Sequence, residues 1–106
     1  MVWKKAKMSE NDVKNAIIDA LNKMGHYAFL VNNLAVRGRS LPKRQPKGLP
    51  DIHCALKGGK YLYVETKFGK EKQSTEQKEF QRRVEALGHV YLVAYSLDEF
   101  LKQYEA

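Results

Sequence analysis

The sequence predicts an α/β domain in which a mixed central sheet is flanked by helices, with elements in the order αβββαβα. Three observations predict this class. Apolar residues recur at helical spacing near the N-terminus, two short apolar runs are joined by a Gly-Gly turn, and a helix-like segment separates these runs from another strand-like segment. A hairpin followed by a helical crossover to a further strand gives a sheet with antiparallel and parallel neighbours.

The first predicted helix covers residues 10–24. Ser9 and Asp12 have the spacing of a capping box, so the helix is expected to begin after Ser9. Gly25 suits a left-handed cap at its C-terminal end. The apolar residues that repeat at helical spacing are Val13, Ala16, Ile17, Ala20, Leu21 and Met24. Residues 27–32 (YAFLVN) are short, aromatic and β-branched, which predicts a strand.

A loop is expected over residues 33–50, because prolines and glycines recur there. Two short apolar runs follow, at residues 52–56 and 61–66, and Lys57-Gly58-Gly59-Lys60 separates them. The two glycines supply the positive φ angles that a tight turn needs. These runs are therefore predicted to pair as antiparallel strands.

A second helix is predicted over residues 75–87. Ser74 and Gln77 have capping-box spacing at its start, and Gly88 follows its end. The helix is expected to cross from the hairpin to a last strand at residues 90–95.

A short final helix is expected after the last strand. Ser96 and Glu99 have the spacing of a third helix start. Its inward-facing residues are expected to be Phe100, Leu101 and Tyr104.

The length of 106 residues suits one domain, expected over residues 9–106 after a basic N-terminal extension of residues 1–8. The single cysteine, Cys54, excludes an intramolecular disulfide and zinc sites built from paired cysteines. No apolar run is long enough to span a membrane, and the N-terminus lacks the apolar stretch of a signal peptide. These features predict a protein of the reducing cytoplasm. The formal net charge of +7 favours an anionic partner, most commonly nucleic acid.

Two acids and a lysine are expected at one end of the predicted hairpin. Asp51 opens its first strand, and Glu65 and Lys67 lie near the end of its second. Side chains alternate along a strand, so Glu65 and Lys67 share a face, and strand pairing brings Asp51 close to the level of Glu65. Adjacent carboxylates repel, and a hard cation such as Mg²⁺ relieves the repulsion. With a lysine to stabilise developing negative charge, this is a candidate site for metal-assisted phosphodiester hydrolysis.

Each of these residues also has a plainer interpretation. Glu65 and Lys67 can be solvated positions on an edge strand, and Pro50-Asp51 can be a turn. For any one of them the plainer interpretation is the more common. Only the combination, in this order and spacing, favours a catalytic site.

The ordered motifs resemble the PD-(D/E)XK nuclease superfamily, which has a restriction-endonuclease-like core. Pro50-Asp51 and Glu65-Thr66-Lys67 carry the resemblance. The surrounding sequence narrows it to the VRR-NUC (virus-type replication-repair nuclease) branch. The segments concerned are GLPDI at 48–52, YVETK at 63–67, STEQKEF at 74–80 and ALGHVYLVAYSLDEF at 86–100. The resemblance covers most of the chain from Ser9 onward, and the αβββαβ order is the core order of that superfamily.

The resemblance implies a site that uses Mg²⁺, with Mn²⁺ as a substitute. Asp51 and Glu65 would be metal ligands, the backbone carbonyl of Thr66 would add another oxygen, and Lys67 would position the attacking water. Gln77 matches a glutamine that supports the site in this family. It is equally well explained as the capping partner of Ser74, and both roles can hold at once.

The resemblance also implies an acid on the first helix, where the sequence offers Glu10 and Asp12. At about 100° per residue, Glu10 lies at the edge of the apolar stripe, whereas Asp12 turns toward solvent and caps the helix. We therefore expect Glu10 to be the catalytic acid, binding metal through water or binding a second ion. Its alternative role is a carboxylate that stabilises the helix dipole.

The loop before Asp51 is strongly basic. Between residues 37 and 47 it has no acid and five basic residues, namely Arg37, Arg39, Lys43, Arg44 and Lys47. Because it leads into Asp51, it is expected to hold DNA phosphates beside the metal. A solvated loop without a partner is the alternative. Nothing in it is arranged to read bases, so backbone or shape recognition is expected.

Together, residues and resemblance predict a Mg²⁺-dependent DNA endonuclease that acts as a homodimer on branched DNA such as Holliday junctions, in DNA repair. A phage origin would place it in the cytoplasm of a bacterial host. Alternatives are a less selective replication-repair nuclease acting with a helicase, a non-catalytic DNA-binding module with a degenerate site, and a basic RNA-binding domain, for which no aromatic RNA-binding motif is present. No membrane or small-molecule cofactor is expected. The three histidines are expected to be structural, with His53 nearest the site.

Overall fold

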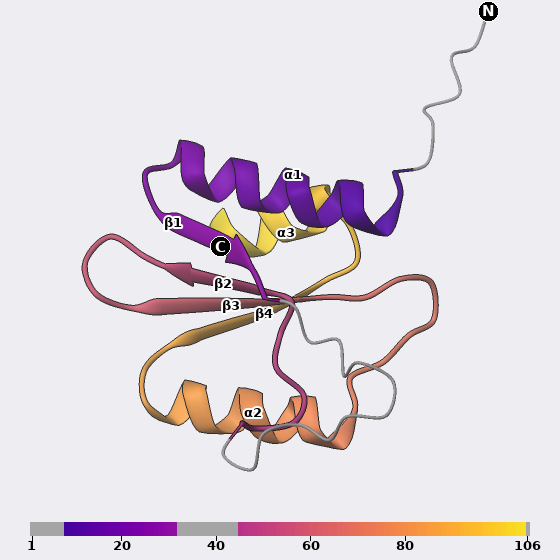
Figure 1. The fold of residues 1–106 in the computed structure, drawn as a ribbon, viewed down its shortest axis with the longest axis vertical. Coiled ribbons are helices and arrows are strands. Elements are labelled where there is room, and N and C mark those ends of the chain that lie inside the picture. The colour runs from indigo at the N-terminus through magenta and orange to yellow at the C-terminus, as the bar shows by residue number, and fades with distance from the viewer. Residues whose placement is uncertain (1–7, 32–44, 106) are drawn as a thin grey trace, which may run out of the picture.

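The computed structural model describes residues 8–31 and 45–105. A sheet lies between two helical layers, with α1 and α3 on one face and α2 on the other (Figure 1). The elements are α1 (Glu10–Lys23), β1 (Tyr27–Leu30), β2 (Ile52–Ala55), β3 (Tyr61–Thr66), α2 (Thr75–Ala86), β4 (Val90–Ala94) and α3 (Leu97–Glu105). This is the predicted order. The predicted bounds agree with the observed ones to within one residue for β2, β3, β4 and α2.

The strands lie side by side in the order β1-β2-β3-β4. β1 pairs antiparallel with β2, β2 pairs antiparallel with β3, and β3 pairs parallel with β4. The hairpin is confirmed, since Gly58 and Gly59 have φ angles of 92° and 101° in the turn between β2 and β3. The parallel pair needs a crossover, which α2 supplies. The mixed sheet predicted from the sequence is therefore present.

The hydrophobic core lies between the sheet and the layer formed by α1 and α3. Ile17 and Leu21 of α1 and Phe100 of α3 are fully buried there. They pack on alternate residues of the sheet, which are Ala28, Ile52, Cys54, Leu62, Val64 and Ala94. Within the described residues, no helix is both long and apolar enough to cross a membrane.

The opposite face of the sheet is covered by α2 through aromatic contacts. Phe80 of α2 packs against Tyr63 and Tyr91, with ring centroids 5.1 and 6.3 Å apart. β1 lies at the free edge of the sheet, and Tyr27 and Phe29 there are exposed. The side chains on this face thus become less covered from β4 toward β1.

The helix starts confirm the capping predictions, with one difference. Ser9 and Asp12, and likewise Ser74 and Gln77, form complete capping boxes. In the third helix start, the Ser96 hydroxyl accepts a hydrogen bond from the Glu99 N–H as expected. The Glu99 carboxylate, however, accepts from the N–H of Tyr95 rather than from that of Ser96. The side-chain half of the third capping box is therefore made with the residue before the expected N-cap.

Candidate metal-dependent active site

The pairing of β2 with β3 brings the two predicted acids together. Ile52 lies opposite Val64, so the next position on each strand places Asp51 level with Glu65. Antiparallel strands hold opposing side chains about 5 Å apart on the same face. Asp51 and Glu65 both line the same cavity. Lys67 lies two residues after Glu65, so by strand alternation its side chain is on the same face as that of Glu65.

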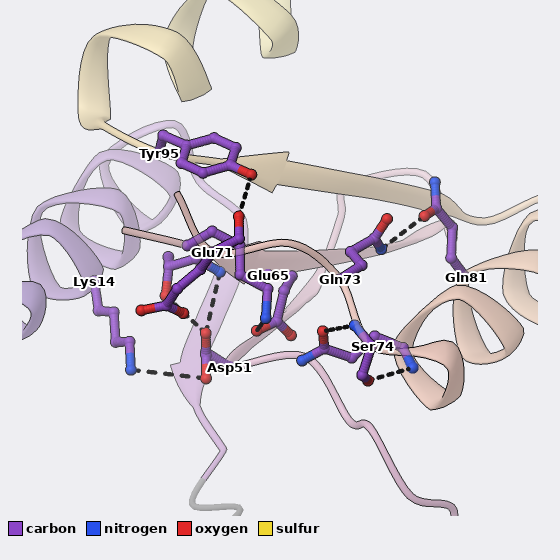
Figure 2. A network of polar contacts seen from close by, with 11 residues as sticks. Lys14, Asp51, Glu65, Glu71, Gln73, Ser74, Gln81 and Tyr95 are labelled. Carbon is purple, nitrogen blue, oxygen red and sulfur yellow. Dashed lines mark hydrogen bonds and ion pairs between the residues drawn. The ribbon is translucent and has the colours of Figure 1, made fainter. Parts of the chain in front are cut away.

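The carboxylate of Asp51 is held on both oxygens. Its Oδ2 accepts hydrogen bonds from the N–H of Thr66 at 3.1 Å and from the Thr66 hydroxyl at 2.7 Å. Its Oδ1 lies 3.7 Å from the ammonium of Lys14, which reaches down from α1 (Figure 2). Asp51 is thus oriented by the neighbouring strand and by the helix above it.

Glu65 is the buried member of the pair. Its residue is 4% exposed, and its Oε2 has no hydrogen-bond partner among the described residues. Its Oε1 lies 3.8 Å from the ammonium of Lys67, which is itself buried. Burial, and next the negative charge of Asp51, raise the pKa of Glu65 to about 8. The carboxylate form is therefore costly here unless a positive charge joins it.

A cavity of about 210 Å³ opens beside the two acids. It is lined by Gln45, Pro46, Gly48, Leu49, Asp51, Glu65 and Gln77. Gly48 makes this shape possible, because its φ is +76° and a Cβ there would lie 2.7 Å from the backbone nitrogen of Gln77. The loop before Asp51 therefore lies directly on the N-terminus of α2. The glycine in the GLPDI segment has a structural reason that spacing alone did not reveal.

Gln77 lies where either of the two roles left open by the sequence can be served. Its Oε1 accepts a hydrogen bond from the N–H of Ser74 at 2.9 Å, so the capping role is confirmed. The residue also lines the cavity with Asp51 and Glu65. Its support of catalysis stays a prediction.

Glu10 is not brought into the acid pair. It is an exposed residue at the start of α1, one helical turn before Lys14, and Lys14 is the side chain that contacts Asp51. Across residues 8–31 and 45–105, no group of three or more His, Cys, Asp or Glu side chains is placed to share an ion. A direct or water-mediated role for Glu10, and the Thr66 carbonyl as a ligand, remain predictions.

The structure describes the predicted DNA-binding loop only from residue 45 onward. Arg37, Arg39, Lys43 and Arg44 lie outside the described residues, and Lys47 is exposed next to the cavity. Further exposed lysines follow β3, at Lys70 and Lys72. Their loop is tied to the sheet, because the Tyr95 hydroxyl donates a 2.6 Å hydrogen bond to the Glu71 carbonyl (Figure 2). Exposed lysines therefore occur in two segments of the sequence that contain or connect residues lining the cavity.

Two of the three histidines have hydrogen bonds that hold the hairpin, and the third lies near the acids. His26 and His89 accept hydrogen bonds through Nδ1 from the N–H groups of Lys57 and Tyr61, which fixes the two ends of the hairpin turn. His53 lies on the face of Asp51, two residues along the strand, and its Nε2 is buried without a partner in the described part of the chain. Burial lowers the pKa of His53, so it stays neutral near pH 7.

Lys14 is the site residue that sequence reasoning missed. The sequence did contain a signal, because Lys14 lies one turn after Glu10 and three residues before the buried Ile17.

The residues present fit a divalent cation. Asp51 and Glu65 line one cavity, and one oxygen of the buried acid lacks a partner within the described chain. Burial, and next the negative charge of Asp51, raise the pKa of Glu65, so a cation bound there would favour its carboxylate form. Oxygen ligands supplemented by water are what Mg²⁺ and Mn²⁺ accept. Asp51 and Glu65 would hold the ion, with Lys67 beside it.

A four-stranded mixed sheet between helical layers, with paired acids at the open end of its hairpin, is compatible with a PD-(D/E)XK-like α/β core. Two solved structures are similar to it. One, described as "VRR_NUC domain", has a TM-score of 0.66 and 24% identity, covering 91% of this chain and 94% of its own. The other, "VRR_NUC domain protein", has a TM-score of 0.60 and 16% identity, covering 95% and 88%. No protein-family model and no curated protein matches the sequence. The chain has the VRR_NUC domain fold, which confirms the fold implied by its motifs.

Proposed function

We propose that the chain is a divalent-metal-dependent DNA endonuclease, using Mg²⁺ or Mn²⁺ at Asp51 and Glu65. The observation that carries the proposal is the pairing of Asp51 with the buried Glu65, which has an oxygen without a partner among the described residues and a pKa raised to about 8. An arrangement this costly is characteristic of functional sites. The similarity to structures described as VRR_NUC domains supports the same conclusion.

The proposed mechanism assigns each residue a task. Asp51 is held by Thr66 so that its carboxylate is oriented before a ligand arrives. When bound, the ion would supply charge that favours deprotonation of water and stabilises the phosphorane-like transition state. Lys67, buried beside Glu65, would orient the attacking water and stabilise negative charge on the phosphate. Water is the nucleophile, and the leaving group is a deoxyribose oxygen of the cleaved DNA strand.

DNA as the substrate is supported by charge. The chain carries a net charge of +7, and exposed lysines, including Lys47, Lys70 and Lys72, lie in the segments that flank the cavity. Lysines of this kind neutralise phosphates and release counterions without reading bases. Arg37, Arg39, Lys43 and Arg44 would extend the same contact.

A branched substrate and a homodimer are part of the proposal, because a two-fold pair of sites cuts two strands symmetrically. The free edge of the sheet supports an interface. Tyr27 is 68% exposed there, next to Phe29 and Leu30, and exposed apolar edge strands are usually covered. Sedimentation of the wild type should show a dimer, and Tyr27→Glu should weaken it. A wild type that stays monomeric at cleavage-active concentrations would remove this part alone.

The central test is cleavage of end-labelled four-way junctions and linear duplexes, with Mg²⁺, Mn²⁺ or EDTA. Asp51→Asn should lower cleavage by roughly a hundredfold or more. Asp19→Asn, a change of an exposed acid on α1, should leave it unchanged. Cutting that survives in EDTA or in Asp51→Asn would overturn the metal site. Binding without cutting in any metal would indicate a DNA-binding module, and equal cutting of both substrates would indicate the less selective nuclease.

A further inference from the structure

Lys14 contacts a carboxylate that would also be a ligand of the proposed metal ion. Its ammonium lies 3.7 Å from Asp51 Oδ1, and the two side chains are 22% and 21% exposed. The other oxygen of Asp51 already accepts two hydrogen bonds from Thr66. Oδ1 is therefore the Asp51 oxygen with capacity left for a further ligand, and Lys14 is the group that faces it.

The charges around the acids are balanced by two lysines. Lys67 lies 3.8 Å from Glu65 Oε1, and Lys14 lies beside Asp51. Lys67 is buried, whereas the Lys14 side chain is partly open to solvent and has a flexible aliphatic stem. A divalent cation near Oδ1 would repel both ammonium groups. Lys14 is the one with room to move away.

We infer that Lys14 competes with the metal for Asp51 in the DNA-free protein. When the metal binds, the Lys14 side chain moves and its ammonium group pairs with a DNA phosphate instead, a movement called the transfer below. This inference rests on the proposed function. In the absence of metal, the Lys14 ammonium offsets negative charge on Asp51. In its presence, the displaced ammonium lies at the site where the anionic substrate must sit. Metal and DNA then strengthen each other's binding, and this coupling is reciprocal.

The first measurement needs neither DNA nor activity. Mn²⁺ binding to the DNA-free protein is followed by the electron paramagnetic resonance signal of free Mn²⁺. Lys14→Gln removes the competing charge, so it should bind Mn²⁺ more tightly, by roughly tenfold. Lys23→Gln is the matched control, because Lys23 is an exposed lysine in the last turn of the same helix. It makes the same change in net charge and should leave the Mn²⁺ affinity unchanged.

The second measurement tests the transfer to phosphate. Fluorescence anisotropy gives the affinity for a labelled duplex with and without Ca²⁺, with a gel confirming that the duplex stays intact. Ca²⁺ should raise the DNA affinity of the wild type and of Lys23→Gln several-fold more than that of Lys14→Gln. A Lys14→Gln protein with the same Ca²⁺ effect as the wild type would overturn the transfer.

Mn²⁺ affinity that is unchanged or weaker in Lys14→Gln would overturn the competition. Circular dichroism reports whether the variant is folded. If it is not, Lys14→Met keeps the aliphatic stem and faces the same two criteria. Suppose that the wild type binds Mn²⁺ and cuts DNA, but that Lys14→Gln changes neither the Mn²⁺ affinity nor the effect of Ca²⁺ on DNA affinity. That result would refute the Lys14 inference and leave the nuclease proposal standing. A wild type that binds no Mn²⁺ refutes both.

Discussion

The two faces of the sheet differ in how completely their side chains are satisfied. Toward α1 and α3, Ile52 and Val64 are fully buried among apolar neighbours. Toward α2, the adjacent positions are Asp51, His53 and Glu65, and both His53 Nε2 and Glu65 Oε2 are buried without partners in the described chain. One face stabilises the fold. The other carries a local free-energy cost that a ligand can relieve, which is the usual conflict at a functional site.

The largest change in unfolding free energy is expected on the apolar face of the sheet, toward α1 and α3. Phe100→Ala removes a fully buried ring where α3 packs on the core. Such a deletion costs about 3–5 kcal/mol in unfolding free energy. A domain of this kind has roughly 5–15 kcal/mol in total. Urea unfolding followed by circular dichroism measures the change, and a loss below about 1 kcal/mol would mean that α3 contributes little to the core.

On the unsatisfied face, stability should depend on pH through Glu65. The pKa of Glu65 is raised from 4.5 to about 8 in the folded protein. Below the lower value the group is protonated in both states. Between the two values the unfolded chain releases its proton while the folded chain keeps it, so the unfolding free energy falls as pH rises through this window. We expect a loss of roughly 2–4 kcal/mol, since one pKa unit is worth about 1.4 kcal/mol.

Glu65→Gln is the control for this pH dependence. It keeps the shape of the side chain and removes its titration, so metal-free thermal melts of the variant should lose much less stability between about pH 5 and pH 8.5. Mn²⁺ should restore the wild type at the upper pH and leave the variant little changed. Equal pH profiles for wild type and variant would show that Glu65 ionises normally.

A smaller effect is expected where the loop meets α2. Gly48→Ala places a Cβ 2.7 Å from backbone atoms of α2 at a φ of +76°. The strain should cost about 1–3 kcal/mol. Because the same loop leads to Asp51, DNA cleavage should fall further than stability alone explains. Gly58→Ala is a comparison with no such close neighbour, and its cleavage rate should be retained.

The smallest stability effects compare two equivalent caps. Ser9→Ala and Ser74→Ala each remove one capping hydroxyl and should each cost about 1 kcal/mol in thermal unfolding. The Ser74 hydroxyl accepts a hydrogen bond from the backbone N–H of Gln77, a residue that lines the cavity, whereas Ser9 is not among the lining residues. Cleavage should therefore drop in Ser74→Ala and stay near the wild-type rate in Ser9→Ala. Equal rates in the two variants would leave Gln77 as a helix cap without a catalytic role.

The fold was predictable because local signals agreed with one another. Capping residues marked two helix starts, and Gly58-Gly59 set the hairpin register that brings Asp51 level with Glu65. Lys14 was less predictable, because its contact with Asp51 joins a helix to a distant strand end, and the local pattern shows only that Lys14 lies beside the apolar stripe of the helix. Glu10 was favoured by its place on the apolar stripe, and helix geometry alone does not show which turn of α1 reaches the sheet end.

The hydrogen bonds from Thr66 to Asp51 bear on how a Glu-x-Lys triplet should be written as a search pattern. The middle position faces away from Glu65 and Lys67, so by strand alternation it looks interchangeable. Here its hydroxyl, 2.7 Å from Oδ2, aligns an acid on the neighbouring strand. Valine would fill nearly the same volume without that donor. A chain with valine at this position would need another group to aim its first acid, and serine or threonine there is a useful criterion when intact sites are sought among distant sequences.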